Sequence, residues 1–331
     1  MNRMFFLLPS IASLIPFGNR MKVTAHVKDT EGNPAVGAIV KVWTDKDHFQ
    51  GLCKGSTYSY YEAVADTNGM AVISFPCYSS SIYGCAYGDL YYREDSGHIP
   101  IKSTFNWADF SVTLTEHSKE ISFTLRRKRN PTSLCYRQPS PWIKLPDGGD
   151  EFGFDLLMSD WIAPYGEGMT ADFYVQREVS PTNRQMTIDG GLVFRGEGNG
   201  AYIRKKVKTT SNFKTDYEAD TNGTYQTCLP LRRIPIPGAP MYTNSVIITE
   251  DEYIVMRTRV EKDAKGNIIK AHYSTMLGAI QMYQHFRNLG YVFNPIPNDP
   301  NLEKDFECST DLERAKWERR HPRKRKDRRA R

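Results

Sequence analysis

The sequence predicts an all-β protein with two β domains, and three observations support this prediction. Along most of the chain, apolar and polar residues alternate with the two-residue period of a half-buried strand. Turn sequences rich in Gly, Pro, Asn and Asp separate the alternating segments. The 331 residues suffice for two domains with a core each, and a composition of 40% hydrophobic and 25% charged residues excludes a collagen, a wholly disordered chain and a multi-span membrane protein.

The positive charge is concentrated at one end of the chain. The formal net charge is +6 at pH 7, but residues 314–331 contain eleven Lys or Arg and two Asp or Glu, a charge of +9. The rest of the chain contains 33 basic and 36 acidic residues, a charge of −3. The body of the protein is therefore mildly acidic, and any binding to nucleic acid would depend on the C-terminal tail alone.

Residues 1–20 have features of an export signal. Arg3 precedes an uncharged run from Met4 to Phe17, which is too short to span a bilayer but fits the apolar region of a signal sequence. The cleavage sequence is poor, and two prolines interrupt the run. We expect an exported protein (periplasmic, cell-surface or secreted) with no transmembrane span. The alternative is translation from Met21, which would leave the protein in the cytoplasm.

The first domain is predicted over residues 21–127. In its first segment, Val23, Ala25 and Val27 fall on one face and polar residues on the other, as in a half-buried strand. The later inward faces follow the same pattern: Ala38, Val40 and Val42; Ala71, Ile73 and Phe75; Val112 and Leu114; Ile121, Phe123 and Leu125. Turns at 29–34 and 66–69 separate them. Short alternating strands joined by such turns predict an antiparallel, immunoglobulin-like β-sandwich.

A family resemblance is visible in this domain. It is carried by Asp29, Gly32, Pro34, Val36-Gly37-Ala38, Val40 and Val42, followed by Asp66, Asn68-Gly69 and Phe75. The pattern resembles the carboxypeptidase-regulatory-like, transthyretin-like sandwich over about 105 residues. The resemblance implies a fold and a non-catalytic accessory role, not peptidase activity. The chain departs from the family pattern by a long insertion between Thr44 and Thr57 and by the segment from Cys77 to Ser96.

Tyrosines are the candidate binding residues of the first domain. Eight of them lie between Tyr58 and Tyr92, and a tyrosine offers a flat apolar ring with a polar tip, suited to stacking on a sugar or a protein partner. The residues chosen as a ligand-binding patch are Tyr83, Tyr87, Tyr91 and Tyr92. The alternative is that these tyrosines fill strands, for which they have a high propensity.

A second β-rich domain is predicted over residues 151–308, after a linker at 128–150. Prolines and glycines mark the linker. Within the domain, residues 253–276 have the pattern of a hairpin, and the segment Met276–Leu289 fits a helix or a strand, of which we prefer the strand. The sequences RNP (129–131), FDLLMSDWIAPYGEG (154–168), KDAKGNIIKAHYS (262–274) and FNPIPNDPNLE (293–303) resemble a group of uncharacterised bacterial secreted proteins. That resemblance implies export but no known activity.

The last segment, 309–331, is predicted to be a short helix and a disordered basic tail. Ser309, Thr310 and Asp311 are candidate N-caps for the helix LERAKWERR, and His321-Pro322 ends it. The remaining residues are almost all charged, so they should be disordered. The tail could bind anionic surfaces weakly, or simply be solvated.

No catalytic or metal-binding pattern is found in the sequence. The seven histidines form no zinc signature, and no nucleophile-elbow motif is present. The glycine-rich segment 196–201 formally fits a dinucleotide motif, but a strand pattern rather than a helix follows it, so we expect a turn. The acidic residues Asp147, Asp150, Glu151 and Asp155 could serve as acid and base or bind calcium, although a solvated linker is the simpler interpretation. We expect no catalytic residue, metal or cofactor.

The six cysteines do not form a CxxC motif, which argues against a zinc ribbon. In an exported protein, Cys77 and Cys85 are the pair we would expect to form a disulfide, because the residues between them could form a loop. Free buried thiols are the alternative.

The predicted function is that of a non-catalytic, exported binding or structural protein that recognises a glycan or another envelope protein. An enzyme is the less favoured alternative, as a glycan-acting hydrolase with carboxylates in the second domain. A further alternative is a cytosolic protein whose tail binds anionic polymers.

Overall fold

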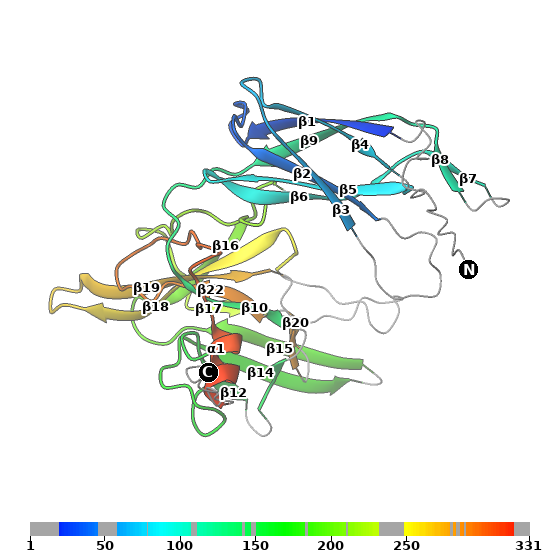
Figure 1. Ribbon diagram of the computed structural model, residues 1–331. Helices are drawn as coiled ribbons and strands as arrows, with labels where there is room; N and C mark the ends of the chain where they lie inside the picture. The colour runs from blue at the N-terminus through cyan, green and yellow to red at the C-terminus, as the bar shows by residue number, and fades with distance from the viewer. Residues whose placement is uncertain are drawn as a thin grey trace, which may run out of the picture. The chain divides into compact units, whose positions relative to one another are not determined.

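The computed structural model confirms the all-β prediction (Figure 1). It describes residues 20–45, 58–77, 79–106, 111–140, 143–146, 150–182, 185–209, 211–231, 248–278, 281–282, 285–287 and 289–320. The predicted export signal, apart from Arg20, and the basic tail 321–331 lie outside these residues. Within them, no helix is long and apolar enough to cross a membrane.

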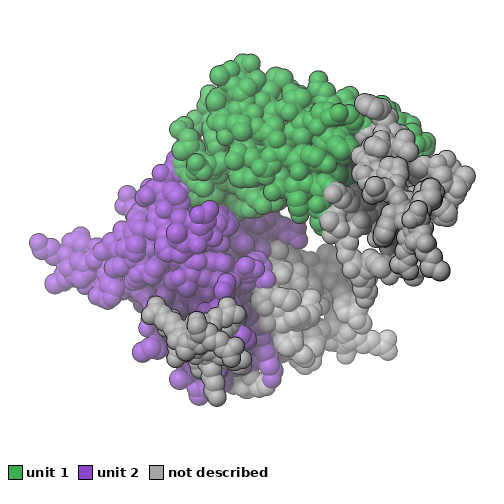
Figure 2. Space-filling model, viewed as in Figure 1, with its two compact units in different colours: residues 1–128, 209–213 green, residues 129–208, 214–331 purple. Residues whose placement is uncertain are grey.

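The chain divides into two compact units (Figure 2). The first unit comprises residues 1–128 together with 209–213, and the second comprises 129–208 and 214–331. The short segment 209–213 thus belongs to the first unit although it comes much later in the sequence. Phe213 of this segment is buried, with its ring centroid 5.0 Å from that of Tyr92, and Arg126 donates a hydrogen bond to its carbonyl at 3.2 Å.

The first unit is a sandwich of two sheets, β4-β1-β9 and β3-β2-β5-β6, with the additional hairpin β7-β8. The strands are β1 (Arg20–Asp29), β2 (Ile39–Asp45), β3 (Tyr58–Val64), β4 (Met70–Pro76), β5 (Ser81–Gly88), β6 (Tyr91–Pro100), β7 (Ser103–Asn106), β8 (Ser111–Leu114) and β9 (Ser118–Leu125). Most neighbours are antiparallel, as predicted, but β1 and β9 are parallel. A parallel pair is possible here because the whole second sheet lies between these two strands in the sequence.

The core between the two sheets of the first unit contains the predicted inward faces, except for Val112, whose side chain lies outside the described part of the structure. Val23, Ala25 and Val27 of β1 are buried, and the alternate residues of β2, β4 and β9 join them in one cluster. Tyr61 of β3 stacks on Phe75 of β4, with centroids 4.7 Å apart, so the core extends to the edge of the sandwich. Because the strand period is two, the remaining residues of β2, β3, β5 and β6 point to the opposite, outer face of their sheet.

The second unit contains the sheets β16-β18-β19-β22-β10-β23, β13-β12-β14-β15-β17 and β11-β21-β20. The strands are β10 (Cys135–Ser140), β11 (Ile143–Lys144), β12 (Glu151–Asp155), β13 (Asp160–Trp161), β14 (Phe173–Thr182), β15 (Gln185–Val193), β16 (Gly200–Lys205), β17 (Cys228–Pro230), β18 (Glu252–Lys262), β19 (Ile268–Leu277), β20 (Gln281–Met282), β21 (His285–Arg287), β22 (Leu289–Phe293) and β23 (Thr310–Asp311). The predicted hairpin is β18-β19, and the ambiguous segment that follows it contains strands. The glycine-rich segment 196–201 leads into β16, so it is a turn, as predicted.

The structure corrects the prediction of a linker at residues 128–150. Residues 135–140 form β10, which pairs with β22 and β23 inside a sheet. The prolines of this region were expected to exclude a strand, but β10 contains one of them. Pro139 lies where the β10–β22 register shifts, and its ring packs so close to Gly290 that a Cβ at position 290 would be 2.6 Å from it. The irregularity and the glycine together accommodate a proline within the sheet.

The C-terminal helix α1 (Leu312–Arg320) is present where it was predicted. Of the candidate N-caps, Asp311 is the one used, because its carboxylate accepts hydrogen bonds from the backbone N–H groups of Glu313 and Arg314 at 3.1 and 3.2 Å.

Candidate functional site

The outer face of the β3-β2-β5-β6 sheet carries the main group of candidate binding residues. On β2, Val40 and Val42 point into the core, so Lys41 and Trp43 are placed on the outer face. The register of the sheet then decides which side chains of β3, β5 and β6 lie beside each of them. Two neighbouring rows of side chains result, and both run across the strands.

The first row is aromatic and consists of Tyr60, Trp43, Tyr83 and His98, one from each strand. Neighbouring ring centroids are 6.3, 5.9 and 5.7 Å apart along this order. Tyr58 adds a further ring beside Tyr60, with centroids 6.4 Å apart. Tyr60 is 56% exposed, and Trp43 and Tyr83 are half-buried. We call Tyr60, Trp43, Tyr83 and His98 the aromatic row.

The second row is charged and consists of Glu62, Lys41, Cys85 and Asp95. Lys41 Nζ lies 3.0 Å from a Glu62 oxygen, and Arg93 lies 2.8 Å from Asp95 at the other end. Lys41 also connects the two rows, since its Nζ is 4.7 Å from the Tyr60 ring centroid. We call Glu62, Lys41, Cys85 and Asp95, with Arg93, the charged row.

The electrostatics of the charged row favour the charged forms of Lys41 and Arg93 and the neutral thiol of Cys85. The hydrogen bond between Lys41 and Glu62 raises the pKa of Lys41, and the one between Arg93 and Asp95 raises the pKa of Arg93. Burial raises the pKa of the Cys85 thiol. A thiol with a raised pKa is a poor nucleophile, so Cys85 is not activated for reaction.

The structure separates the four predicted tyrosines. Tyr83 is in the aromatic row, and Tyr87 is half-buried near Lys41 and Arg93 of the charged row. Tyr91 and Tyr92 are only 9% and 3% exposed, because Tyr91 packs into the sandwich core and Tyr92 against Phe213. The inclusion of these last two in a surface patch is therefore a correction.

The structure also corrects the expectation of a Cys77–Cys85 disulfide, because both residues are free thiols. Cys77 belongs to the sandwich core, where its Sγ lies 3.6 Å from the carbonyl oxygen of Ser79. Cys85 lies in the charged row on the outer face of β5, beside Lys41. Cys77 follows β4 and lies in the core, whereas the alternation of β5 turns Cys85 to the outer face of its sheet. The loop length between the two cysteines does not reveal this separation.

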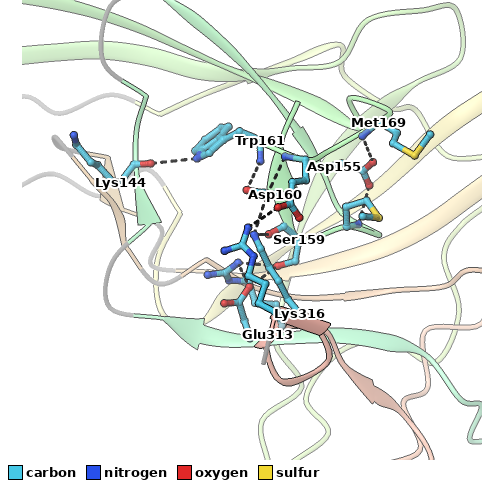
Figure 3. A network of polar contacts seen from close by, with 12 residues as sticks. Lys144, Asp155, Ser159, Asp160, Trp161, Met169, Glu313 and Lys316 are labelled. Atoms are coloured by element: carbon cyan, nitrogen blue, oxygen red, sulfur yellow. Dashed lines mark hydrogen bonds and ion pairs between the residues drawn. The ribbon is translucent and has the colours of Figure 1, made fainter. Parts of the chain in front are cut away.

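The second unit contains a network of polar contacts around Asp155 (Figure 3). The Asp155 carboxylate accepts hydrogen bonds at 2.9 to 3.0 Å from the backbone N–H groups of residues 157, 158, 169 and 170. It also forms an ion pair with Arg259 at 2.8 Å. Arg259 also forms a two-pronged pair with Asp172. Burial alone would raise the pKa of Asp155, but these backbone hydrogen bonds and Arg259 outweigh it and lower the pKa. Every oxygen of this buried carboxylate is occupied in holding the 155–170 loop.

The same loop is tied to helix α1. Glu313 accepts hydrogen bonds from Arg137 at 2.6 Å and from Ser159 at 2.9 Å, and Lys316 pairs with Asp160 at 2.8 Å (Figure 3). Asp155, the one buried acidic residue of the sequence FDLLMSDWIAPYGEG, thus organises the loop, and the half-buried Asp160 takes part in its contact with the helix. The network has the character of a structural support rather than of a catalytic site.

A cavity of about 320 Å³ opens in the second unit. It is lined by Arg129, Asn130, Asp216, Tyr217, Glu218, Asn301 and Glu303. The buried Glu303 carboxylate accepts hydrogen bonds from the backbone N–H groups of Arg129 and Asn130 at 2.8 and 2.6 Å, and Asn301 donates to the Asn130 carbonyl at 2.7 Å. Hydrogen bonds among the residues that line the cavity therefore join residues 129–130 to residues 301–303, which are distant in sequence.

The acidic residues considered for catalysis or calcium do not come together. Asp147 lies outside the described residues, Asp150 is exposed, Glu151 pairs with Arg195, and Asp155 is buried in the network above. Among the residues that the structure describes, no group of three His, Cys, Asp or Glu side chains is placed to hold a metal ion.

Sequence reasoning did not identify Trp43, His98 or Arg259. Trp43 could have been found from its position, since it follows the inward-facing Val40 and Val42 by one residue and must face outward. His98 and Arg259 depend on strand register and on a bulge, for which the local sequence gives no signal.

No protein-family model matches the sequence, and no curated protein is similar to it. Solved structures with a partial likeness include 3-chlorocatechol 1,2-dioxygenase from Rhodococcus opacus 1CP, at 10% identity over 34% of this chain and 61% of that one, with a TM-score of 0.24. An intradiol ring-cleavage dioxygenase from Tetranychus urticae has 13% identity over 33% and 81%, with a TM-score of 0.22. Catechol 1,2-dioxygenase from Acinetobacter sp. ADP1 has 12% identity over 35% and 55%, with a TM-score of 0.23. The chain thus spans less than two thirds of two of these proteins, and the likeness at these scores supports no statement about activity.

Proposed function

We propose that this protein is a non-catalytic binding protein that recognises a glycan through the aromatic row of its first unit. One observation carries the proposal: Tyr60, Trp43, Tyr83 and His98 form a continuous series of rings across an outer sheet face. Aromatic rings of this kind present apolar area on which the C–H faces of sugars stack, and the tips of Tyr and Trp offer hydrogen bonds to hydroxyl groups.

The charged row supports the same proposal. Glycan recognition needs fixed hydrogen-bond donors and acceptors beside the stacking surface. Lys41 and Glu62 hold each other at 3.0 Å, and Arg93 and Asp95 do so at 2.8 Å, which orients groups that would otherwise be mobile. A protein partner is the competing ligand class, and the experiment below separates the two.

The proposal is tested by a glycan array with the full chain and three variants. Trp43→Ala and Tyr83→Ala should each reduce the array signal at least about tenfold, which corresponds to roughly 1.4 kcal/mol. Val72→Thr is the matched control, because Val72 is 49% exposed on β4 of the other sheet, and it should bind like the wild type. An array on which no glycan binds, or on which both aromatic variants bind normally, would refute the proposal and leave a protein partner as the ligand to search for.

We also propose that the protein acts outside the cytoplasm. The uncharged run from Met4 to Phe17 after Arg3 supports this. N-terminal sequencing of the protein purified from its natural source tests it. A mature chain that starts near residue 21 and is recovered outside the cytoplasm supports export, and recovery from the cytoplasm contradicts it.

A further inference from the structure

We infer that the ligand is a neutral, linear glycan, bound across the strands through an internal stretch of at least three sugar residues. The inference rests on the proposed function, and it specifies the class and the orientation of the ligand. It follows from three properties of the outer face: the direction of the aromatic row, the pairing of the charges, and the closed packing around Cys85 in the charged row.

The aromatic row fixes the direction and the length of the ligand. Its rings come from four adjacent strands, so the row runs perpendicular to the strands, with centroid steps of 6.3, 5.9 and 5.7 Å. Each step is close to the length of one pyranose residue in an extended chain. The planes of Tyr60 and Tyr83 lie 40° and 14° from that of Trp43, whereas His98 stands at 75° to Tyr83. A linear glycan laid along the row can therefore place one sugar on each of Tyr60, Trp43 and Tyr83, which accommodates three consecutive residues with His98 edge-on at the end.

The charged row fixes the charge of the ligand. Lys41 is neutralised by Glu62, and Arg93 by Asp95, so these two pairs give no net charge beside the aromatic row. Paired carboxylates and cations still donate and accept hydrogen bonds from hydroxyl groups. A carboxylated or sulfated glycan would gain nothing from such pairs and would be repelled by Glu62 and Asp95 as much as it is attracted by their partners.

The packing within the charged row favours an internal stretch of the glycan over its end. Cys85 sits in the middle of the charged row and has 0% exposure, so its neighbours cover it completely. At this point there is no hole into which a terminal sugar could insert.

The experiment is a chain-length series measured by titration calorimetry and by tryptophan fluorescence with the full chain. The neutral probes are β-1,4-linked oligomers of glucose, mannose and N-acetylglucosamine with one to six residues, and the acidic probes are oligogalacturonides of the same lengths. We expect the affinity of a neutral oligomer to rise at least about tenfold in total from one residue to three or four, and then to level off. Oligogalacturonides should bind at least about threefold more weakly than neutral oligomers of equal length.

Two variants make the result specific. Tyr60→Ser removes the exposed ring at one end of the row, so the plateau should be reached one residue earlier, whereas Val72→Thr should leave the series unchanged. Circular dichroism confirms that each variant is folded.

The possible failures are distinguishable. If every oligomer binds with the same affinity as its monosaccharide, but Trp43→Ala abolishes that binding, the proposed function stands and this inference is wrong. Tighter binding of the acidic series overturns the neutral part of it. If no probe binds the wild type, this inference is wrong, and the glycan array decides the proposed function separately.

Discussion

Trp43 and Tyr83 lie side by side across the paired strands β2 and β5, with ring centroids 5.9 Å apart and planes 14° from parallel. They meet because residues 43 and 83 share a register position and the strand period turns both outward. The sandwich core lies on the other side of this sheet. Substitution of either ring should therefore affect recognition more than folding.

A double-mutant cycle measures this contact. Trp43→Ala and Tyr83→Ala should show a coupling of about 0.5 to 1.5 kcal/mol in the free energy of unfolding, which is typical of an aromatic pair. Urea denaturation of the wild type, both single variants and the double variant provides the number. Additive effects, with no coupling, would mean that the two rings do not interact in solution.

The Asp155 network predicts loss of stability in acid. Because the pKa of Asp155 is lowered on folding, its contribution is present above the ordinary pKa of an aspartate and is lost as the pH falls through the folded-state value. Asp155→Asn should cost about 2 to 4 kcal/mol at pH 7, since it breaks the pair with Arg259 and leaves backbone N–H groups unmatched. Its stability should also depend less on pH below about 4.

The control for this prediction is Glu318→Gln, in the exposed pair with Arg314 at 3.0 Å. It should leave the unfolding free energy close to that of the wild type, because the pair is exposed to solvent. Equal effects of the two substitutions in urea melts at pH 7 would contradict the structural role of Asp155.

Glu94 predicts the opposite pH dependence. Burial raises its pKa to about 7, although the backbone N–H of Thr124 donates a hydrogen bond to it at 2.6 Å. The folded state keeps the proton over a range where the unfolded chain has released it, so this residue lowers stability as the pH rises from about 4.5 to about 7. Glu94→Gln keeps an acceptor for Thr124 and removes the titration.

The stability gain of Glu94→Gln over the wild type should therefore be about 1 to 3 kcal/mol greater at pH 7.5 than at pH 4.5. Urea melts at the two pH values give the difference. A gain that is the same at both would show that Glu94 does not titrate in this range.

The thiols predict a pattern of chemical reactivity. Cys77 and Cys85 are buried, and burial raises the pKa of both, whereas Cys228 and Cys308 are exposed. In the native protein, iodoacetamide should label Cys228 and Cys308 and spare the other two, which become reactive in urea. Peptide mapping by mass spectrometry without reduction identifies the labelled positions. A linked 77–85 peptide pair would contradict the structure.

The core of the first unit could be predicted because its signal is local. Residues 23, 25 and 27 alternate with polar neighbours, and a strand with one buried face allows only one orientation. The same argument places Lys41 and Trp43 outside. What alternation cannot supply is the register between strands, which decides that Trp43 meets Tyr83.

Tyr91 and Tyr92 show why the predicted patch was only partly right. The β5–β6 pairing has a register shift between Ala86 and Gly88, just before these tyrosines, and shifts of this kind interrupt simple alternation. Tyr92 is then covered by Phe213, more than a hundred residues away in the sequence. Contacts of such separation leave no trace in the local pattern. The Asp155–Arg259 pair was not foreseen for the same reason.

In contrast to these long-range contacts, two turns have a geometry that is determined by five consecutive residues. In Asp29–Asn33 the aspartate Oδ1 accepts hydrogen bonds from the N–H groups of residues 31 and 33 at 2.9 and 2.8 Å, and in Asp263–Asn267 from residues 265 and 267, both at 2.8 Å. Gly32 has a φ of +89° and Gly266 of +85°. The shared sequence Asp-x-x-Gly-Asn gives the same turn in both units.

These turns predict that substitution of either glycine lowers the free energy of unfolding by a similar amount. A Cβ added at Gly32 or Gly266 would meet no atom within 4 Å, so only the left-handed backbone conformation is penalised. Gly32→Ala and Gly266→Ala should each cost about 1 to 2 kcal/mol. Gly→Asn at either site should cost less, because asparagine tolerates this region better than alanine. Urea melts of the four variants test the argument. A large difference between the two alanine variants, or asparagine as costly as alanine, would mean that contacts beyond the five residues set the turn.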